Sequence, residues 1–272
     1  MLKQRIPTAV ILGSIVIAII TTGSQLLFSI LMGLFVLVGA WEWAGLSGAE
    51  NQLYRSGYAV LTVGLAFLMF FITDISYSHG IYIIGTLWWC LASVMVVLYQ
   101  YGRPAIPKHN FLKYLFGFFV LIPSTLGLVY LFGSNRGPLL VMLLFVLIWV
   151  IDSSAFLIGR CWGKKKLAYR VSPGKSWEGF IASLLAAGFM ALVYTEYGLI
   201  AVTNTTCLVI LFIMTAGFSV IGDLFESMYK RNVNLKDSSQ LLPGHGGVLD
   251  RIDSLTAAVP VYALGLWLLE TR

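Results

Sequence analysis

The sequence predicts an all-α integral membrane protein, a bundle of about nine transmembrane helices with its N-terminus in the cytoplasm. Three observations lead to this class. Of the 272 residues, 58% are hydrophobic and only 11% are charged, whereas an ordinary soluble domain has about 25% charged residues. Long apolar runs recur along the whole chain, and Lys and Arg cluster in alternate connecting segments. So few charges cannot cover a water-facing surface, and lipid is therefore the main solvent.

Nine apolar runs are candidate transmembrane helices, because a helix needs roughly 20 mostly apolar residues to cross the hydrocarbon core. The runs show no alternation of period 2, which disfavours a β-barrel. The first two runs lie close enough to form one long broken helix, and the first is expected to be retained because no convincing signal-peptide cleavage site follows it. The predicted helices cover residues 7–24, 25–46, 55–74, 80–101, 112–133, 137–159, 178–197, 204–226 and 255–270.

The orientation follows from Lys and Arg, which favour cytoplasmic loops. With a cytoplasmic N-terminus and nine crossings, only Arg136 and Arg272 of the 18 basic residues fall outside. The net charge of +6 is thus concentrated on one membrane face, where it favours anionic lipid head groups and nucleotides. Nucleic acid is not an expected partner, since no soluble domain is present to bind it.

The first half of the chain, residues 1–150, is predicted to be a transmembrane scaffold. Its only acids are Glu42, Glu50 and Asp74, and none has an acidic neighbour within a helical turn. We interpret Trp41-Glu42-Trp43 as an anchor at head-group depth, where amphipathic Trp rings gather. A role in a lipid site is the alternative.

The second half, residues 151–272, is predicted to be the catalytic region of the same integrated domain. Polar, Gly- and Pro-containing cytoplasmic loops at 160–177 and 227–254 interrupt its helices. Half of the chain's twelve acids lie in or beside these loops, namely Asp152, Asp223, Glu226, Asp237, Asp250 and Asp253. Of these, Asp152 and Asp223 lie in apolar spans, where an ionised group is costly unless it has a partner. Both are therefore functional candidates, with a buried structural ion pair as the alternative.

The second loop combines groups suited to a metal ion and to phosphates. Asp250 and Asp253 are three residues apart, as are Asp223 and Glu226, so each pair shares one face of a helix. Carboxylates grouped in this way suit Mg²⁺, which is commonly held by one or two carboxylates and substrate phosphates. The cations Lys230, Arg231, Lys236 and Arg251 alternate with the acids and suit phosphate oxygens.

Two turns add backbone or side-chain donors to this set. The segment Gly244-His245-Gly246-Gly247 lets backbone N–H groups approach an anion closely. In the first loop, Ser172-Pro173-Gly174-Lys175-Ser176 presents a Lys and two hydroxyls before a helix, as a phosphate grip would, although it is not a Walker A motif. A salt-bridged juxtamembrane loop would explain any one of these residues, but the whole cluster indicates nucleotide chemistry.

At these residues the chain resembles the phosphatidate cytidylyltransferase family, also called CDP-diacylglycerol synthases. The family pattern of Ser, Lys-Arg, Lys-Asp, Pro-x-His-Gly-Gly and Asp-Arg-x-Asp is met from Ser227 to Asp253 with every spacing kept. The run from Asp152 to Gly179 and Trp41-Glu42-Trp43 are also similar to bacterial members. Small departures, such as Tyr169 at a position where Pro is common, leave the charged set untouched.

The resemblance implies transfer of a cytidylyl group from CTP to phosphatidic acid, giving CDP-diacylglycerol and pyrophosphate. It implies a homodimer among the lipids of the bacterial inner membrane, with Mg²⁺ and a second cation such as K⁺. The implied metal ligands are Asp223 and Asp250, with Asp253 next. The expected catalytic residues are Asp223, Asp250, Asp253, Lys230, Arg231 and His245, and the expected substrate-binding residues are Ser172, Lys175, Ser176, Ser227, Lys236, Asp237, Gly246, Gly247 and Arg251.

No protein base is expected in such a reaction. The nucleophile would be a phosphate monoester, whose second pKa is about 6 for the comparable phosphate on a side chain, so it is mostly dianionic near neutral pH. We therefore expect His245 to shape the Gly-rich turn or to donate a hydrogen bond to a phosphate oxygen, with proton transfer as the alternative.

Two other functions would use some of the same residues. A CTP-dependent lipid kinase would need similar acids and lysines but would release CDP. An ion-coupled transporter would use Asp152 and Asp223 as coupling sites, although transporters place such sites near the midplane and these acids lie toward the cytoplasmic ends of their spans.

The orientation predicts which loops a membrane-impermeant thiol reagent reaches in intact cells. In a chain whose three natural cysteines are replaced by Ala, Lys108→Cys, Lys165→Cys and Lys236→Cys should resist the reagent, and Arg136→Cys should react. Opening the cells should make all four positions reactive, which controls for burial. Labelling of Lys236→Cys from outside would overturn the orientation.

Overall fold

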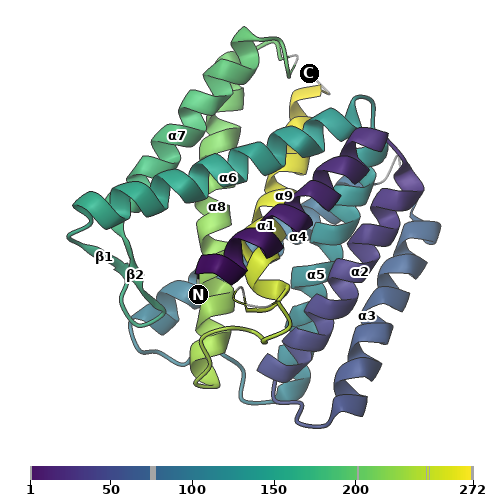
Figure 1. Cartoon of the computed structure of the whole chain (residues 1–272), viewed down its shortest axis with the longest axis vertical. Helices are drawn as coiled ribbons and strands as arrows, with labels where there is room; N and C mark the ends of the chain where they lie inside the picture. The colour runs from purple at the N-terminus through teal and green to yellow at the C-terminus, as the bar shows by residue number, and fades with distance from the viewer. Residues whose placement is uncertain (1, 74–77, 201, 243, 245, 271–272) are drawn as a thin grey trace.

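The computed structural model describes residues 2–73, 78–200, 202–242, 244 and 246–270, and the side chains of these except residues 2–9 and 270. Asp74, His245 and Arg272, which entered the sequence predictions, lie outside the described residues. The described chain forms nine α-helices and one hairpin (Figure 1). They are α1 (Leu2–Thr22), α2 (Gln25–Leu46), α3 (Gln52–Ile72), α4 (Ser78–Gln100), α5 (Asn110–Gly133), α6 (Gly137–Trp162), β1 (Lys166–Ala168), β2 (Ser172–Ser176), α7 (Trp177–Glu196), α8 (Thr205–Asn232) and α9 (Leu249–Glu270).

The predicted all-α membrane class is confirmed. Eight of the helices, α2 to α9, are long and apolar enough to cross a bilayer. In α1 the apolar part with described side chains, Val10–Thr22, is shorter, so a ninth crossing stays a prediction. Large apolar side chains cover the outside of the bundle, as lipid contact requires; Leu53, Leu185 and Phe71 are each about two-thirds exposed or more.

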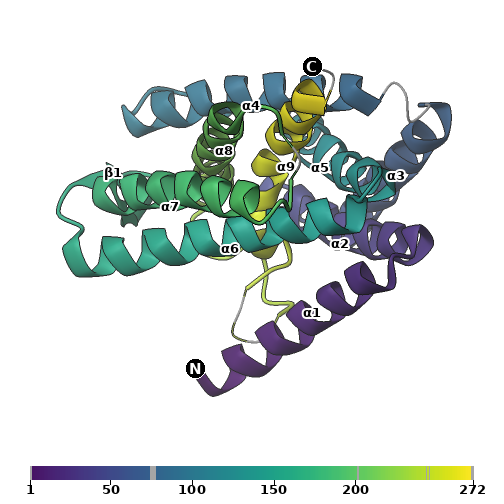
Figure 2. The ribbon, with the colours of Figure 1, turned by 90° about the horizontal axis from the view of Figure 1, so that it is seen from above.

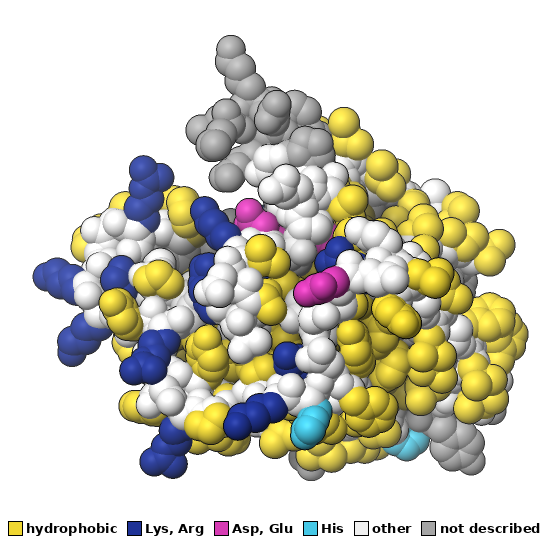
Figure 3. Space-filling model, turned by 90° about the horizontal axis from the view of Figure 1, so that it is seen from below, with side chains coloured by type: hydrophobic (Ala, Val, Ile, Leu, Met, Phe, Trp, Pro, Cys, Tyr) yellow, Lys and Arg dark blue, Asp and Glu magenta, His cyan; other side chains and the backbone are white. Residues whose placement is uncertain are grey.

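The connections between helices lie at two opposite ends of the bundle. The lower end in Figure 1, which we call the loop end, holds four of them: α2 to α3, α4 to α5, α6 to α7 and α8 to α9. The turns from α1 to α2, from α5 to α6 and from α7 to α8 lie at the upper end, as does the C-terminus. Figure 3 views the loop end, where Lys and Arg side chains gather mainly on the hairpin side and a few acids lie among them. This sorting is the one that the predicted orientation requires.

The first two apolar runs form separate helices. Gly23, at the break between α1 and α2, has a φ of +67°, a left-handed conformation that glycine adopts without steric cost. Ser24 then caps α2, its hydroxyl accepting a hydrogen bond from the backbone N–H of Leu27 at 3.4 Å. The chain reverses here, and α1 lies along one side of the bundle, with Ile20 near its end packed into the core (Figure 2).

Two predicted helix ends were wrong, and both errors affect the charged cluster. The predicted span 204–226 extends to Asn232 in α8, and the predicted span 255–270 begins at Leu249 in α9. The second loop therefore covers residues 233–248 instead of 227–254. The added turn of α8 contains Met228 and Tyr229, which are fully buried, so tertiary packing holds as helix a segment whose polar residues resembled a loop.

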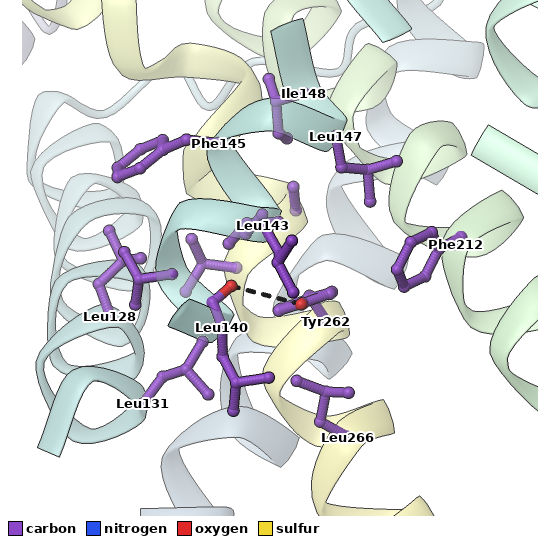
Figure 4. Close-up of a cluster of buried hydrophobic side chains, with 14 of the residues drawn as sticks. Leu128, Leu131, Leu140, Leu143, Phe145, Leu147, Ile148, Phe212, Tyr262 and Leu266 are labelled. Carbon is purple, nitrogen blue, oxygen red and sulfur yellow. Dashed lines mark hydrogen bonds between the residues drawn. The ribbon is translucent and has the colours of Figure 1, made fainter. Parts of the chain in front are cut away.

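The central core surrounds α6, which runs obliquely across the bundle (Figure 1). Figure 4 shows leucines of α6 packed between Leu128 of α5, Phe212 of α8 and Leu266 of α9. The hydroxyl of Tyr262 on α9 donates a hydrogen bond to the backbone carbonyl of Leu140 on α6 at 3.4 Å. This core lies away from the loop end and holds the helices that carry the charged cluster.

Helices α8 and α9 approach each other closely at Gly222. A Cβ atom at this position would overlap the backbone carbonyl oxygen of Asp253 and lie 3.0 Å from the Cβ of Ala257. Apolar burial drives helices together weakly in lipid, so small residues that permit close packing are important at such crossings. Because Gly222 precedes Asp223, this contact brings the acids of the two helices together.

Gly222→Ala should therefore destabilise the protein, by about 1–3 kcal/mol for an overpacked site. Gly217→Ala on the same helix is the matched control, because its new Cβ would meet nothing within 4 Å and Ala favours a helix over Gly by about 1 kcal/mol. Thermal unfolding of both variants in detergent should show a lower midpoint for Gly222→Ala only. Equal midpoints would contradict the close approach.

Candidate active site

Lys230 lies between two carboxylates at the loop end of α8. Its Nζ atom is 3.2 Å from Glu226 Oε1, one turn earlier on the same helix, and 2.5 Å from Asp250 Oδ1 in the first turn of α9. All three side chains are at most 8% exposed. A buried charge is tolerated when it is paired, so Lys230 provides a partner for both carboxyl groups and joins the two helices.

The second oxygen of Asp250 organises the loop before α9. Asp250 Oδ2 accepts hydrogen bonds from the backbone N–H of Ser238 at 2.8 Å, the Ser238 hydroxyl at 2.9 Å and the backbone N–H of Gly247 at 2.8 Å. Gly246 beside it has a φ of +82°, and a Cβ there would lie 2.7 Å from Asp250 Oδ2. The predicted Gly-rich turn is thus wrapped around a carboxylate of the protein in this structure.

A hairpin between α6 and α7 brings Lys175 to the acids. Strands β1 and β2 pair antiparallel, with Lys166 opposite Ser176 and Ala168 opposite Ser172. From β2, Lys175 Nζ reaches Asp223 Oδ2 of α8 at 2.7 Å, with about a quarter of the Lys175 side chain exposed. The sequence predicted a rigid turn presenting this lysine, and the structure presents it from a strand.

Two of the predicted substrate-binding serines have protein partners. Ser227 donates a hydrogen bond from its hydroxyl to Asp223 Oδ1 at 3.2 Å. Ser176 is 4% exposed and caps α7, because its hydroxyl accepts a hydrogen bond from the backbone N–H of Gly179 at 3.2 Å. Ser172 is partly buried on β2. Contact of these serines with a substrate stays a prediction.

The remaining predicted cations and Asp237 lie around the rim. Arg231 Nε donates to the carbonyl of Val171 at 3.3 Å, and its Nη1 donates to the carbonyl of Leu235 at 3.1 Å. Arg231 thereby ties the hairpin to the end of α8. Lys236, Asp237 and Arg251 are exposed, which leaves their charged ends available to an incoming anion.

The interior of the site holds more carboxyl groups than ammonium groups. Asp223, Glu226, Asp250 and Asp253 face Lys175 and Lys230, and Asp253 lies near enough to repel both Asp223 and Glu226. Glu226 is 3% exposed, and within the described chain its oxygens have no hydrogen-bond partner beyond the ion pair with Lys230. Asp253 Oδ1 accepts a local hydrogen bond from the backbone N–H of Ser254 at 2.7 Å. Such an excess of buried carboxylates favours an additional cation.

The described His, Cys, Asp and Glu side chains nowhere form a group of three or more that would hold a metal ion by themselves. Lysine ammonium groups contact both Asp223 and Asp250. The donor set therefore fits a Mg²⁺ ion that one or two carboxylates and substrate phosphates hold together, and not a closed protein cage. The assignment of Asp223, Asp250 and Asp253 as ligands stays a prediction.

A cavity of about 440 Å³ opens beside these acids. Its walls are mostly apolar and come from α1, α2, α5, α6 and α9, including Leu12, Val16, Phe35 and Trp149. The charged side chains that line it are Asp152, Asp250, Arg251 and Asp253. This combination of an apolar chamber with a charged region suits an amphiphile that has a phosphate head and hydrocarbon chains.

Glu42 of α2 is the residue of this site that the sequence analysis missed. The interpretation of Trp41-Glu42-Trp43 as an interfacial anchor is wrong for Glu42 and Trp43, which are both fully buried. Trp43 donates from Nε1 to the carbonyl of Lys113 at 2.9 Å, and Glu42 accepts hydrogen bonds from the loop before α9. A lone acid in an otherwise apolar span was the available signal.

Comparisons with known proteins agree with this site. The sequence model of the cytidylyltransferase family matches residues 3–269. A protein of Haemophilus influenzae named phosphatidate cytidylyltransferase is 37% identical over 282 residues, covering 97% of this chain and 98% of the relative. Proteins of the same name from Pseudomonas aeruginosa and Brucella abortus are 39% and 34% identical, over 98% and 97% of this chain and 97% and 92% of their own lengths.

These relatives match along their whole length, and the family model spans both the scaffold helices and the acid–lysine cluster. The resemblance seen between Ser227 and Asp253 is thereby confirmed. The chain belongs to the cytidylyltransferase family.

Proposed function

We propose that this chain transfers a cytidylyl group from CTP to phosphatidic acid, releasing pyrophosphate and CDP-diacylglycerol for phospholipid synthesis. One observation carries the proposal for the site. In a member of this family, paired acids and lysines from α8, α9 and the hairpin meet beside an apolar cavity among the membrane helices. The names of the bacterial relatives support phosphatidic acid as the acceptor.

The cavity supports a placement for the lipid. Its apolar walls suit the acyl chains, and Asp152, Asp250, Arg251 and Asp253 lie where the head group would be. Of these, only Arg251 attracts a phosphate directly, and Lys175 and Lys230 are held nearby by Asp223 and Asp250. Exposed Lys236, which does not line the cavity, suits the triphosphate of CTP, because Lys binds phosphate oxygens strongly.

Mg²⁺ is the proposed cofactor, held by Asp223 and Asp250 with Asp253 beside them, and a second cation such as K⁺ is proposed with it. The excess of carboxylates over lysines supports this assignment. When bound, the metal ion would neutralise the charge that builds on the leaving pyrophosphate. The carboxylates would in turn fix its position, and Lys175 and Lys230 would shift toward phosphate oxygens.

The proposed reaction is a single in-line displacement. An oxygen of the phosphatidate phosphate forms a bond to the α-phosphorus of CTP, and the bond from that phosphorus to the bridging oxygen of the β-phosphate breaks. The electron pair leaves with pyrophosphate. Lys175 and Lys230 orient the anions, and no side chain needs to remove a proton because the phosphate monoester is already mostly dianionic near neutral pH. His245, outside the described residues, is assigned a hydrogen bond or a role in the turn.

We further propose that the loop end faces the cytoplasm of the bacterial inner membrane, so that CTP reaches the site from the side on which it is made. The gathering of Lys and Arg at that end supports this side, since basic residues favour the cytoplasm. A homodimer surrounded by membrane lipids is proposed as the working form.

The reaction is tested with purified protein in detergent, given CTP, phosphatidic acid and Mg²⁺. We expect CDP-diacylglycerol and pyrophosphate in equal amounts. Release of CDP with a phosphorylated lipid would assign a kinase instead, and formation of neither product would overturn the proposal. Substrate-dependent uptake into proteoliposomes would instead support the ion-coupled transporter.

Asp250→Asn and Asp223→Asn should each lower turnover in this assay by about 100-fold, the usual scale for removing one electrostatic stabiliser. Each change keeps the shape of the side chain and removes its charge. Glu196→Gln is the control, because Glu196 is exposed at the opposite end of α7. The variants should elute as the folded protein does on size exclusion. Near-full activity of Asp250→Asn at saturating Mg²⁺ would show that the assignment is wrong.

A further inference from the structure

We propose that Glu42 is a positioning residue of the reaction, which holds the loop of residues 236–248 and the start of α9 so that Asp250 is presented correctly. This inference rests on the proposed role of Asp250. Glu42 is the only acid of α2, a helix of the scaffold half. It lies far in sequence from the family pattern of Ser227 to Asp253, and the proposal gives it a role in the site.

Four hydrogen bonds connect Glu42 to residues about 200 positions later. Oε1 accepts from the Ser239 hydroxyl at 2.5 Å and the backbone N–H of Val248 at 3.0 Å. Oε2 accepts from the Ser238 hydroxyl at 3.1 Å and the backbone N–H of Leu249 at 2.6 Å. The first N–H groups of a helix have no partner within it, so Glu42 caps α9 from another helix.

The charge of Glu42 is balanced by these donors. Its side chain is 0% exposed, and among the described residues no Lys, Arg or His forms an ion pair with it. Hydrogen bonds to an ionised carboxylate are about twice as strong as neutral ones, and the N-terminus of a helix favours negative charge. Glu42 therefore binds the loop firmly, and the loop has no second anchor of this kind on α2.

Ser238 connects Glu42 to Asp250. Its hydroxyl oxygen lies 3.1 Å from Glu42 Oε2 and 2.9 Å from Asp250 Oδ2, and one hydroxyl proton serves only one of them at a time. The Ser238 and Gly247 N–H groups also donate to Asp250. Glu42 holds the residues on both sides of these donors, namely Ser239 and Val248, and so fixes the donors that orient Asp250.

Glycine at 247 shows how closely the carboxylate approaches this loop. A Cβ at Gly247 would overlap both the Ser238 hydroxyl and Glu42 Oε1. The glycine that the family pattern places here is thus required by the close approach of Glu42 and Ser238. Loss of the Glu42 contacts would free Ser238, Gly247 and the first turn of α9 together.

Glu42→Gln is the informative variant. Each oxygen of Glu42 accepts from one backbone N–H and one serine hydroxyl. An amide NH₂ in either position would therefore face a backbone N–H that cannot accept, although the hydroxyl could turn to accept from it. Ser239→Ala removes one contact and leaves the donors of Asp250 in place. Glu50→Gln is the matched control, since Glu50 is the next acid in the chain and is exposed after α2.

The experiment combines hydrogen exchange of the protein without CTP or Mg²⁺ with steady-state kinetics of the same samples. In Glu42→Gln we expect amides of residues 238–249 to exchange about tenfold faster, on the scale of one unsatisfied buried donor, with α4, α5 and α7 unchanged. We expect kcat to fall about tenfold and the KM for CTP to change less than threefold. Ser239→Ala should show a smaller effect of both kinds, and Glu50→Gln neither.

Three results would overturn the proposal. Turnover within twofold of the unchanged protein, with faster exchange at 238–249, would show that Glu42 shapes the loop without serving the reaction. Faster exchange throughout the helices would give it a general role in stability. Unchanged exchange at residues 238–249 would show that the Glu42 contacts do not hold this loop. Lack of activity in the unchanged protein would instead reject the proposed function, and the exchange data would remain valid without it.

Discussion

The structure depends on one constraint, that a carboxylate placed inside a bundle of membrane helices must find a partner there. Lys230 meets this need for Glu226 and Asp250, and Lys175 meets it for Asp223. Each pairing draws on a different part of the fold. The first needs the close crossing of α8 and α9 at Gly222, and the second needs the hairpin to extend from α6 and α7 to α8. Because both cations are held by acids in this state, substrate phosphates would enter a site whose lysines are already positioned.

The two halves of the chain serve this site differently. The residues proposed to act in the reaction lie on α8, α9 and the hairpin, whereas α1, α2, α5 and α6 supply most of the apolar wall of the cavity. Glu42 is the exception, a charged group that the scaffold contributes to the catalytic loop. The packing of Trp43 on Phe225 and Tyr229, with ring centroids 6.1 and 4.6 Å apart, keeps α2 against α8 beside this contact. The scaffold therefore sets the position of the site as well as enclosing it.

The sequence was sufficient for the fold class, because apolar runs of about 20 residues have few alternatives in lipid. It also identified the acids and lysines, since charged groups in or beside such runs are costly unless they have a use. It misplaced the ends of α8 and α9, because burial of Met228 and Tyr229 and capping by Glu42 hold polar segments as helix. The hairpin was missed for a related reason: its strands of three and five residues are too short to show a period. The residues that contact Glu42 lie about 200 positions later in the chain, and no local sequence pattern predicts such a contact.

The position of the cavity among membrane helices has an energetic consequence for an acyl substrate. A water-soluble enzyme would have to extract its lipid from the bilayer, and each CH₂ group exposed to water costs about 0.8 kcal/mol. Here the chamber is bordered in part by α2, α5, α6 and α9, which are long and apolar enough to cross a bilayer. An acyl chain would pass from one hydrocarbon environment to another, so the partition free energy of the tails nearly cancels. Discrimination between lipids would then depend on the head group, which is the part that the acids, lysines and arginine of the loop end can contact.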